Sequence, residues 1–361
     1  MGFFRRNEQS HQTPENQEET ADTKMQEAER SHVEGLKAAF QESWEKNHRE
    51  DDPDVLLEML LSPHVDEKDV PSNLRSKLEG ADIYMLEASG WTRSDMRKWN
   101  SDSKGKMKSR GFSGYATALQ EAVQETGVLV MSPDIRRRHP SVEEGRRLRA
   151  EYDDIVSLPF HEAAQKYDEH LRARAARTQK REMEVMNNIP VLIRKALNKN
   201  KALRKKKSLS VIMTYGSMHT ALYHALSATE ISATREMGET LYPRSAELMR
   251  RYIFGVGGTE RDLELSARAL IEDVFFGASN LWLKAVGANT AERTVLSRLV
   301  VDRLSAEDLS EIWDVQLDAS QGNVSITPQW TAAVLAAFEK TGFTMPKTRE
   351  ELDELLQSER K

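Results

Sequence analysis

The chain of 361 residues contains no cysteine, which excludes disulfide bonds, thiolate metal sites and cysteine nucleophiles. It also has no apolar run that approaches the roughly 18 to 20 residues needed to cross a bilayer. The N-terminal segment MGFFRRNEQSHQ has two arginines but no apolar stretch after them, so we expect no secretory signal. We therefore expect a cytoplasmic protein in which any metal site uses His, Asp and Glu.

A net basic charge is lacking as well. The net charge is -6, and residues 1–52 hold 13 acids and 7 bases, which leaves 45 of each in the remainder. A neutral body gives no support for general nucleic-acid binding. The basic run 194–207 could touch phosphates or anionic lipid, but such runs more often form the solvated C-terminal end of a helix. We therefore expect no nucleic-acid partner.

The N-terminal region divides into two parts. Residues 1–28 are rich in Gln, Glu, Asn and Thr, a composition that cannot bury enough surface to offset the entropy of ordering, so they predict a disordered acidic tail. Residues 29–52 predict a helix that docks onto the main domain. The apolar residues with helical spacing in this part are Val33, Leu36, Ala39, Phe40 and Trp44.

Residues 53–241 alternate between strand-like and helix-like segments. The predicted strands are 55–61, 83–86, 128–131, 209–215 and 230–235. The predicted helices are 72–79, 114–126, a segment that begins at His219, and a long helical insertion at about 141–200 that Pro159 and Pro190 interrupt. This alternation predicts an α/β fold with a mostly parallel sheet flanked by helices.

Residues 242–361 show helical patterns throughout and predict an all-helical C-terminal region. Its last two helices, at 328–341 and 348–358, each begin with a cap residue or a first-turn proline. A protein partner, or a second copy of the chain, could bind through these helices.

Three of the strand-like segments end on a residue that can bind a metal or move a proton. DVLLEMLLSPH ends at His64, DIYMLE ends at Glu87, and SLSVIMTYGSMH ends at His219. Ligand sites of open α/β sheets lie at the carboxyl ends of the strands, so we interpret the three as one site. Gly216 is expected to tolerate a positive φ at the turn and to keep a Cβ out of the site.

These segments, in this order, resemble the TraB/PrgY/Tiki group and its relatives ChaN and erythromycin esterase. The resemblance rests on four motifs: LSPH at 61–64, ADIYMLEASGW at 81–91, REMEVMNNI at 181–189 and YGSMHTALYHAL at 215–226. The resemblance covers about residues 54–236. The chain departs from the pattern at Leu61, which replaces the first motif's glycine, and at Glu182, Val185 and Met186, which replace Asp, Met and Ala.

The resemblance implies a hydrolase-like site that is metal-dependent in some members, with His64, Glu87 and His219 converging and Arg181 nearby. Two imidazoles and a carboxylate are a normal ligand set for one divalent ion such as Mn, Co or Zn. Without metal, the same three residues could perform acid/base chemistry, with Arg181 holding an anionic group. The bond cleaved would be an ester, an amide or a peptide bond.

Other interpretations of the same residues stay open. A single histidine at a strand end is more often structural than catalytic. The fold could also serve a non-enzymatic binding or regulatory protein that uses its helical C-terminal region to hold a partner. The arginines at 136–138 follow a strand end and could line the same cleft, which would favour an anionic substrate.

Overall fold

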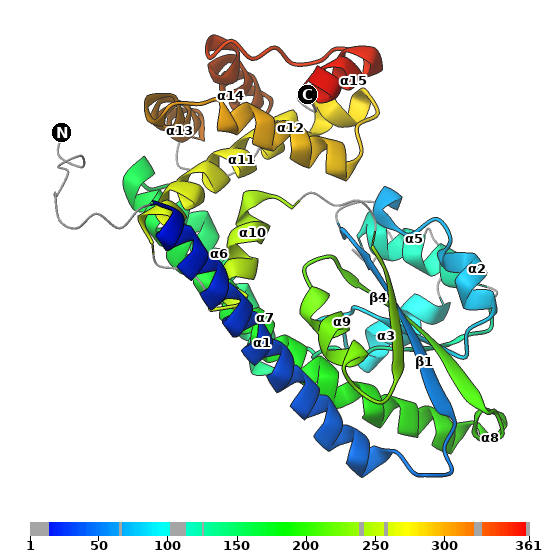
Figure 1. The fold of residues 1–361 in the computed structure, drawn as a ribbon. Helices are drawn as coiled ribbons and strands as arrows, with labels where there is room; N and C mark the ends of the chain where they lie inside the picture. Colours follow the sequence, from blue (N-terminus) through cyan, green and yellow to red (C-terminus); the bar gives the residue numbers. More distant parts are fainter. Residues whose placement is uncertain are drawn as a thin grey trace.

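The computed structural model describes residues 14–64, 67–101, 113–124, 126–237, 242–255, 259–320 and 327–358. Within these ranges five parallel strands form one sheet, in the order β3-β2-β4-β1-β5. Figure 1 shows β4 and β1 side by side in this sheet. The strands are β1 (Asp54–Ser62), β2 (Ile83–Leu86), β3 (Leu129–Met131), β4 (Ser208–Gly216) and β5 (Ser232–Met237). The predicted α/β class is confirmed, and each predicted strand overlaps an observed one.

Helices precede and follow the central strand β4. Those before it are α1 (Pro14–Asn47), the 3-10 helix η1 (Glu67–Asp69), α2 (Leu74–Glu79), α3 (Arg93–Ser101), α5 (Gly114–Val123), α6 (Pro140–Ile155), α7 (Phe160–Lys199) and α8 (Lys201–Arg204). Those after it are α9 (Thr220–Ser227), α10 (Arg244–Ile253), α11 (Glu260–Ala285), α12 (Thr290–Asp302), α13 (Ala306–Ser320), α14 (Pro328–Lys340) and α15 (Arg349–Ser358).

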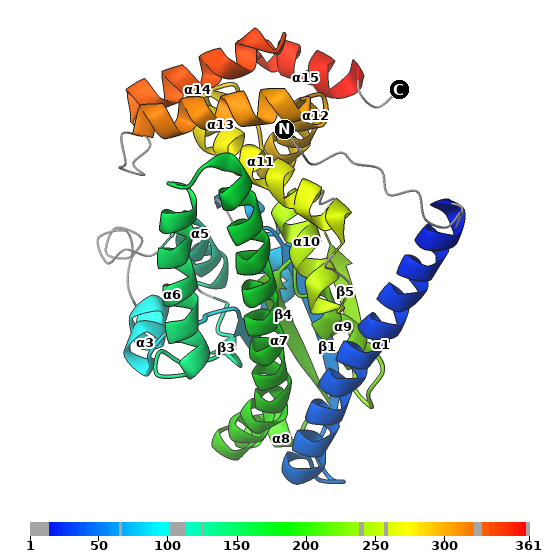
Figure 2. The same ribbon diagram turned by 90° about the vertical axis from the view of Figure 1, so that its left-hand side faces the viewer.

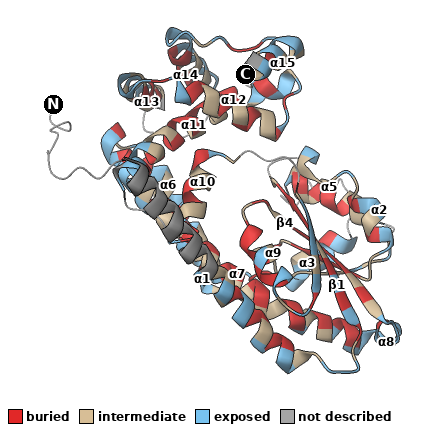
Figure 3. Cartoon of the chain, in the orientation of Figure 1, coloured by how far each residue is buried: buried red, intermediate tan, exposed pale blue. Residues whose placement is uncertain are grey.

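Helices cover both faces of the sheet. On one face, Met59 and Val211 pack with apolar side chains of α1, α7 and α9. On the other face, Leu60 and Ile212 pack with side chains of α2, α3 and α5, including Trp99. Successive strand residues point to opposite faces, so strands that are buried on both sides have nearly continuous apolar runs. Figure 3 shows the buried residues along these strands.

The strand order brings distant parts of the chain to one edge of the sheet. β4 lies between β1 and β2, with Ser62 paired to Gly216 and Leu86 paired to Thr214. The chain leaves β1 toward β2 on one side and leaves β4 toward β5 on the other. Such diverging connections open a crevice at the carboxyl ends of the strands, where α/β proteins bind their ligands.

The long helix α7 belongs to two hydrophobic cores. Its first half, which includes Tyr167 and Leu171, packs with the C-terminal helices, and its second half, which includes Ile189 and Ile193, packs on the sheet. Figure 2 shows the helix running from one region to the other. Pro159 precedes α7 as predicted, but the expected interruption at Pro190 is wrong. The buried residues on either side of this proline hold the helix against the sheet.

The helix α1 docks as predicted but begins earlier. Leu36, Phe40 and Trp44 are buried against the sheet domain, where α1 packs on α7 and α9. Residues 14–28, which we expected to be disordered, belong to this helix, and residues 1–13 lie outside the described residues. The physical reason is propensity, because Glu, Gln, Ala, Lys and Met favour a helix even where they cannot build a core.

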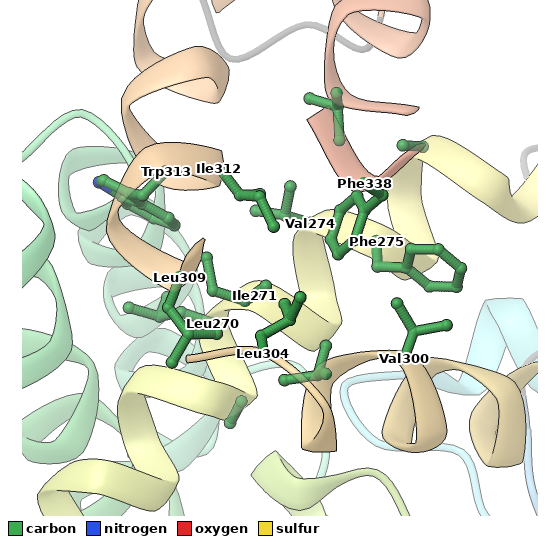
Figure 4. Packing of buried hydrophobic residues seen from close by; sticks show 14 of the residues in the cluster. Leu270, Ile271, Val274, Phe275, Val300, Leu304, Leu309, Ile312, Trp313 and Phe338 are labelled. Atoms are coloured by element: carbon green, nitrogen blue, oxygen red, sulfur yellow. The ribbon is translucent and has the colours of Figure 1, made fainter. Parts of the chain in front are cut away.

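The C-terminal helices pack around a core that they share with α6 and the first half of α7, and Figure 4 shows part of it. Its members include Leu270, Phe275, Val300, Trp313 and Phe338. Capping boxes formed by Thr259 with Asp262 and by Asn289 with Glu292 fix the starts of α11 and α12. Among the described residues, the helices are all too short or too polar to span a membrane.

Candidate functional site

The three strand-end residues meet at the carboxyl edge of the sheet. His64 lies two residues beyond β1, Glu87 comes directly after β2, and His219 lies three residues beyond β4. His64 Nδ1 is 3.1 Å from Glu87 Oε2, and His219 Nε2 is 3.6 Å from Glu87 Oε1. The structure therefore places both imidazoles beside one carboxylate.

Arg181, from the middle of α7, binds the same carboxylate. Its Nη2 donates to Glu87 Oε1 at 2.6 Å, its Nε donates to Asp134 Oδ1 at 2.8 Å, and the Gly216 N–H donates to Glu87 Oε2 at 2.7 Å. Burial raises the pKa of Glu87, but Arg181 and His219 outweigh this effect and hold the pKa well below its usual range. Glu87 is thus an ionised carboxylate with donors on both oxygens.

His219 is held from its other side by a second carboxylate of α7. Its Nδ1 lies 2.9 Å from Glu182 Oε1, and Glu182 Oε2 lies 2.7 Å from His32 Nε2 on α1. Burial lowers the pKa of His219, but Glu87 and Glu182 more than reverse this effect and raise it to about 9. At neutral pH, His219 is therefore a buried cation between two carboxylates.

Gly216 gives these groups the space to approach each other. A Cβ at this position would lie 3.3 Å from Glu87 Oε2, 3.7 Å from His219 Cδ2 and 3.9 Å from His64 Nδ1. The expected absence of crowding is therefore observed. The expected positive φ is wrong, because Gly216 ends β4 in register with β1 and lacks that conformation. A strand end needs no left-handed residue.

Leu61 does not need to be a glycine in this fold. Its side chain is buried in the core on the face of the sheet covered by α7 and α9. Ser62, the next residue, is the one that pairs with Gly216. The departure from the family pattern at position 61 therefore leaves the approach of His64 to Glu87 unobstructed.

His64 differs from His219 because one of its ring nitrogens has no partner. The ring stacks on Tyr115, with 4.1 Å between the ring centroids. Its Nδ1 faces Glu87, whereas its Nε2 is buried and has no hydrogen-bond partner in the part of the chain that the structure describes. Buried polar atoms without partners are rare in proteins, so this nitrogen marks a place where a bound molecule can be recognised.

A cavity of about 400 Å³ lies between these strand ends and the C-terminal helices. One side, which we call the sheet wall, includes His64, Glu87, Gly216 and His219. The other side, which we call the helical wall, includes these residues of α10, α11 and α12: Ala246, Asp273, Phe276, Ala291 and Thr294. This volume suits a small molecule or a short peptide segment. The C-terminal helices thus complete the candidate site.

The residues fit a hydrogen-bonded carboxylate better than a metal ligand set. Within the described ranges, His, Asp and Glu side chains form no group of three or more arranged to hold a metal ion. The Arg181 guanidinium occupies one Glu87 oxygen, the Gly216 N–H occupies the other, and His219 is protonated at neutral pH. A metal ligand must present a free lone pair, so His219 would have to lose its proton and Glu87 would have to give up a donor to bind one, whereas His64 could bind through Nε2.

Three residues of this network were not among those predicted from the sequence. Asp134 follows β3, so the rule that located Glu87 after β2 could have located it too. Glu182 follows Arg181 and stands where the TraB/PrgY/Tiki pattern has an aspartate. An acidic residue at this position could therefore have been proposed as part of the site. His32 comes from a helix far away in the chain, and no local pattern points to it.

Other basic residues lie away from this site. Arg136 lines a separate cavity of about 480 Å³ with Arg93, Arg97 and Lys195, so it does not share the cavity of His64 and Glu87. The basic run 194–207 lies at the amino ends of the strands, where Lys206 binds Asp82 just before β2. It is therefore at the opposite edge of the sheet from the site.

Comparisons of this chain with family models, with curated proteins and with solved structures find no match. The resemblance to the TraB/PrgY/Tiki group therefore stays a prediction.

Proposed function

We propose that the protein is a hydrolase that cleaves an ester, amide or peptide bond in the cavity between the sheet wall and the helical wall. The observation that supports this proposal most strongly is the state of His64. Its Nδ1 faces an ionised carboxylate at 3.1 Å, its Nε2 is buried without a hydrogen-bond partner among the described residues, and the residue lines the cavity. A carboxylate that orients an imidazole whose other nitrogen is free is the arrangement of a general base.

In the proposed reaction, His64 Nε2 removes a proton from a water molecule, whose oxygen attacks the carbonyl carbon of the substrate. The negative charge that develops on the carbonyl oxygen is stabilised by the His219 imidazolium. Its Nε2 is 3.6 Å from Glu87 Oε1, longer than an ordinary hydrogen bond, and the residue lines the cavity. Collapse of the intermediate breaks the bond to the leaving group, which takes the proton from His64.

Glu87 and Arg181 position the two histidines in this proposal. Glu87 keeps its charge throughout, since Arg181 and the Gly216 N–H bind it in every step. Arg181 is buried and also binds Asp134, so it neutralises two carboxylates and does not need to contact the substrate. A fixed charge of this kind needs no reorganisation during the reaction.

A metal-dependent version of the same hydrolase is the alternative mechanism. It would use His64, Glu87 and His219 as ligands of Mn, Co or Zn, and the ion would supply an activated water. It requires His219 to lose its proton and Glu87 to give up a present donor. Elemental analysis of protein purified without a chelator separates the two versions. One ion per chain, lost in both His64→Gln and His219→Gln, would overturn the metal-free mechanism.

The test of the proposed function is hydrolysis of a panel of activated esters, anilides and short peptides. The parent protein is compared with His64→Gln and His219→Gln, and with His161→Gln as a control, because His161 is exposed at the start of α7. We expect both site variants to lose about 100-fold or more in kcat, and the control to keep its rate. A folded parent that hydrolyses none of the panel would contradict the proposal.

A non-enzymatic binding protein is the second candidate, supported by an observation on the outside of α11. Leu281 is 79% exposed and its neighbour Trp282 is 44% exposed, and exposed apolar pairs of this kind often contact partners. A second copy of the chain or another protein could bind there. Sedimentation of the parent and of Leu281→Lys tests this candidate. A parent oligomer that dissociates in the variant, without hydrolysis by either, would favour it.

A further inference from the structure

A third cavity, of about 410 Å³, lies beside the long helix α7 and is rich in arginine. We call it the arginine cavity and define it by six lining residues: Arg149, Tyr152, His170, Arg174, Arg177 and Asp273. His170, Arg174 and Arg177 are four and three residues apart, so they share one face of α7. None of these three residues belongs to the site described above.

The arginines of this cavity lack the acidic partners that their neighbours have. Arg146 and Arg147 on α6 pair with Glu143 and Glu151. In the described part of the chain, by contrast, no carboxylate lies within 4.0 Å of the guanidinium groups of Arg149, Arg174 or Arg177. Arg149 and Arg174 are exposed and Arg177 is half-buried, and the three guanidinium groups around one hollow create a positive potential there.

Contacts between α7 and α6 hold Arg177 in place. Its Nε donates to the Ser141 carbonyl oxygen, and its guanidinium lies against Gly145 of α6. A Cβ at position 145 would be only 2.7 Å from Arg177 Cζ, so any larger residue would displace the guanidinium. The glycine therefore makes room for the guanidinium of a residue that lines the cavity.

His170 is the second sign of a ligand. The residue is 5% exposed, lines the cavity, and its Nδ1 is buried with no hydrogen-bond partner among the described residues. Burial and the nearby Arg174 lower the pKa of His170 to about 4, so it is neutral at physiological pH. A buried ring nitrogen without a hydrogen-bond partner is rare in proteins, and here it faces a cavity that three arginines line, so an anion that carries a hydrogen-bonding group would suit both.

The single carboxylate of the cavity does not fill that role. Asp273 Oδ2 accepts hydrogen bonds from Tyr167 at 2.6 Å and from Tyr152 at 3.4 Å. Burial raises the pKa of Asp273, so this group is a weaker counter-ion than a solvated carboxylate. The three arginines therefore have more positive charge than the cavity itself compensates.

We propose that the arginine cavity binds a small dianion of the phosphate-monoester class. Arg guanidinium groups bind phosphate oxygens through paired hydrogen bonds, and several of them around one hollow favour a doubly charged group. The volume accommodates a phosphate with a short organic substituent. This inference does not depend on the proposed hydrolase activity, because it concerns a different cavity and is tested by binding.

The cavity also lies next to the candidate catalytic site, since Asp273 lines both. A dianion bound on one side would attract Arg174, whose charge now lowers the pKa of Asp273 from a distance. The occupant of the arginine cavity can thus change the charge on the helical wall of the other cavity.

Isothermal titration calorimetry at constant ionic strength tests the proposal, with inorganic phosphate and glycerol 3-phosphate as ligands and chloride as the reference anion. We expect Arg174→Met and Arg177→Met to weaken phosphate binding at least 10-fold. Arg147→Met, an exposed arginine on α6 that does not line the cavity, should bind like the parent. Tighter binding of glycerol 3-phosphate would identify an organic ester as the ligand, and equal binding would identify free phosphate.

A second measurement covers the case in which an arginine variant fails to fold. NMR titration of the parent protein at about pH 7.5, where phosphate is mostly a dianion, follows the His170 ring resonances, which should shift when phosphate is added. The shift should be absent with chloride. No phosphate binding by the folded parent, or unchanged His170 resonances in saturating phosphate, would overturn the proposal.

Discussion

The sheet wall and the helical wall of the cavity are built from different kinds of residue. The sheet wall has ionisable side chains, His64, Glu87 and His219, which contact one another directly. The helical wall has mostly neutral side chains, such as Phe276 and Ala291. Residues at strand ends hold the charged groups of the cavity in direct contact with one another. The packed helices opposite them determine the shape of the cavity. The comparison predicts that chemistry and substrate fit can be changed separately.

The largest effect should come from the charge that supports the sheet wall. Arg181→Met leaves the buried Asp134 and the partly buried Glu87 without their shared cation. We expect a loss of about 3–5 kcal/mol in the free energy of unfolding, because unpaired buried charges are costly. Urea denaturation measures this loss. The control Arg146→Met removes an exposed ion pair and should cost less than about 1 kcal/mol. Equal losses in the two variants would contradict the network described here.

Alkaline pH should weaken the sheet wall more than the helical wall. The folded-state pKa of His219 is about 9, above its ordinary value of 6.5. Its contribution to stability is therefore complete below about pH 6.5 and is lost as the pH rises through about 9. The shift corresponds to a few kcal/mol, at about 1.4 kcal/mol per pKa unit.

Denaturation curves of the parent and of His219→Gln between pH 6 and pH 10 measure this contribution. The parent should lose stability across this range, and the variant should lose clearly less. If His219 is the cation of the proposed mechanism, kcat should fall over the same range. Parallel curves for parent and variant would show that His219 is not protonated in the folded protein.

A smaller effect is expected from added bulk on the sheet wall. Gly216→Ala places a methyl group 3.3 Å from Glu87 Oε2, which is tighter than usual, so the carboxylate must move by a few tenths of an ångström. We expect kcat to fall about 10-fold, with a stability change below about 1 kcal/mol. Gly80→Ala is the matched control, because its Cβ would meet no atom closer than 3.9 Å. A similar rate loss in both variants would contradict this account of Gly216.

The smallest effect should come from the helical wall. Ala291→Leu adds apolar volume to the cavity without touching the ionisable groups. We expect KM to rise a few-fold, by about 1 kcal/mol of binding, while kcat stays within two-fold of the parent. Steady-state kinetics on the best substrate of the panel measure both constants. A fall in kcat with unchanged KM would mean that the helical wall takes part in the chemistry.

Much of the sheet could be predicted from the sequence because its inner strands are buried on both faces. β1 and β4 are nearly continuous apolar runs, and such runs have few alternatives to a parallel strand. The meeting of His64, Glu87 and His219 followed from the rule that ligands bind at strand ends. Local pattern and general topology were sufficient for these features.

The rest depends on contacts between distant segments. The helical wall was not predicted, because no local pattern shows which face of α11 or α12 meets the strand ends. Glu182 and His32 lie on helices 150 residues apart in sequence, and only the packing of α1 on α7 brings them together. α3 was missed because its charged residues outnumber its apolar ones, and Trp99 is its single fully buried residue.

The position of β4 in the sheet has a consequence for the synthesis of the chain. β1, β2 and β3 are translated first, yet β1 and β2 never pair with each other, since β4 lies between them. Until residue 216 leaves the ribosome, these apolar strands have no central partner, and their edges are open to wrong pairing. A nascent chain of this protein should therefore benefit from a chaperone from the synthesis of β1 until β4 has emerged.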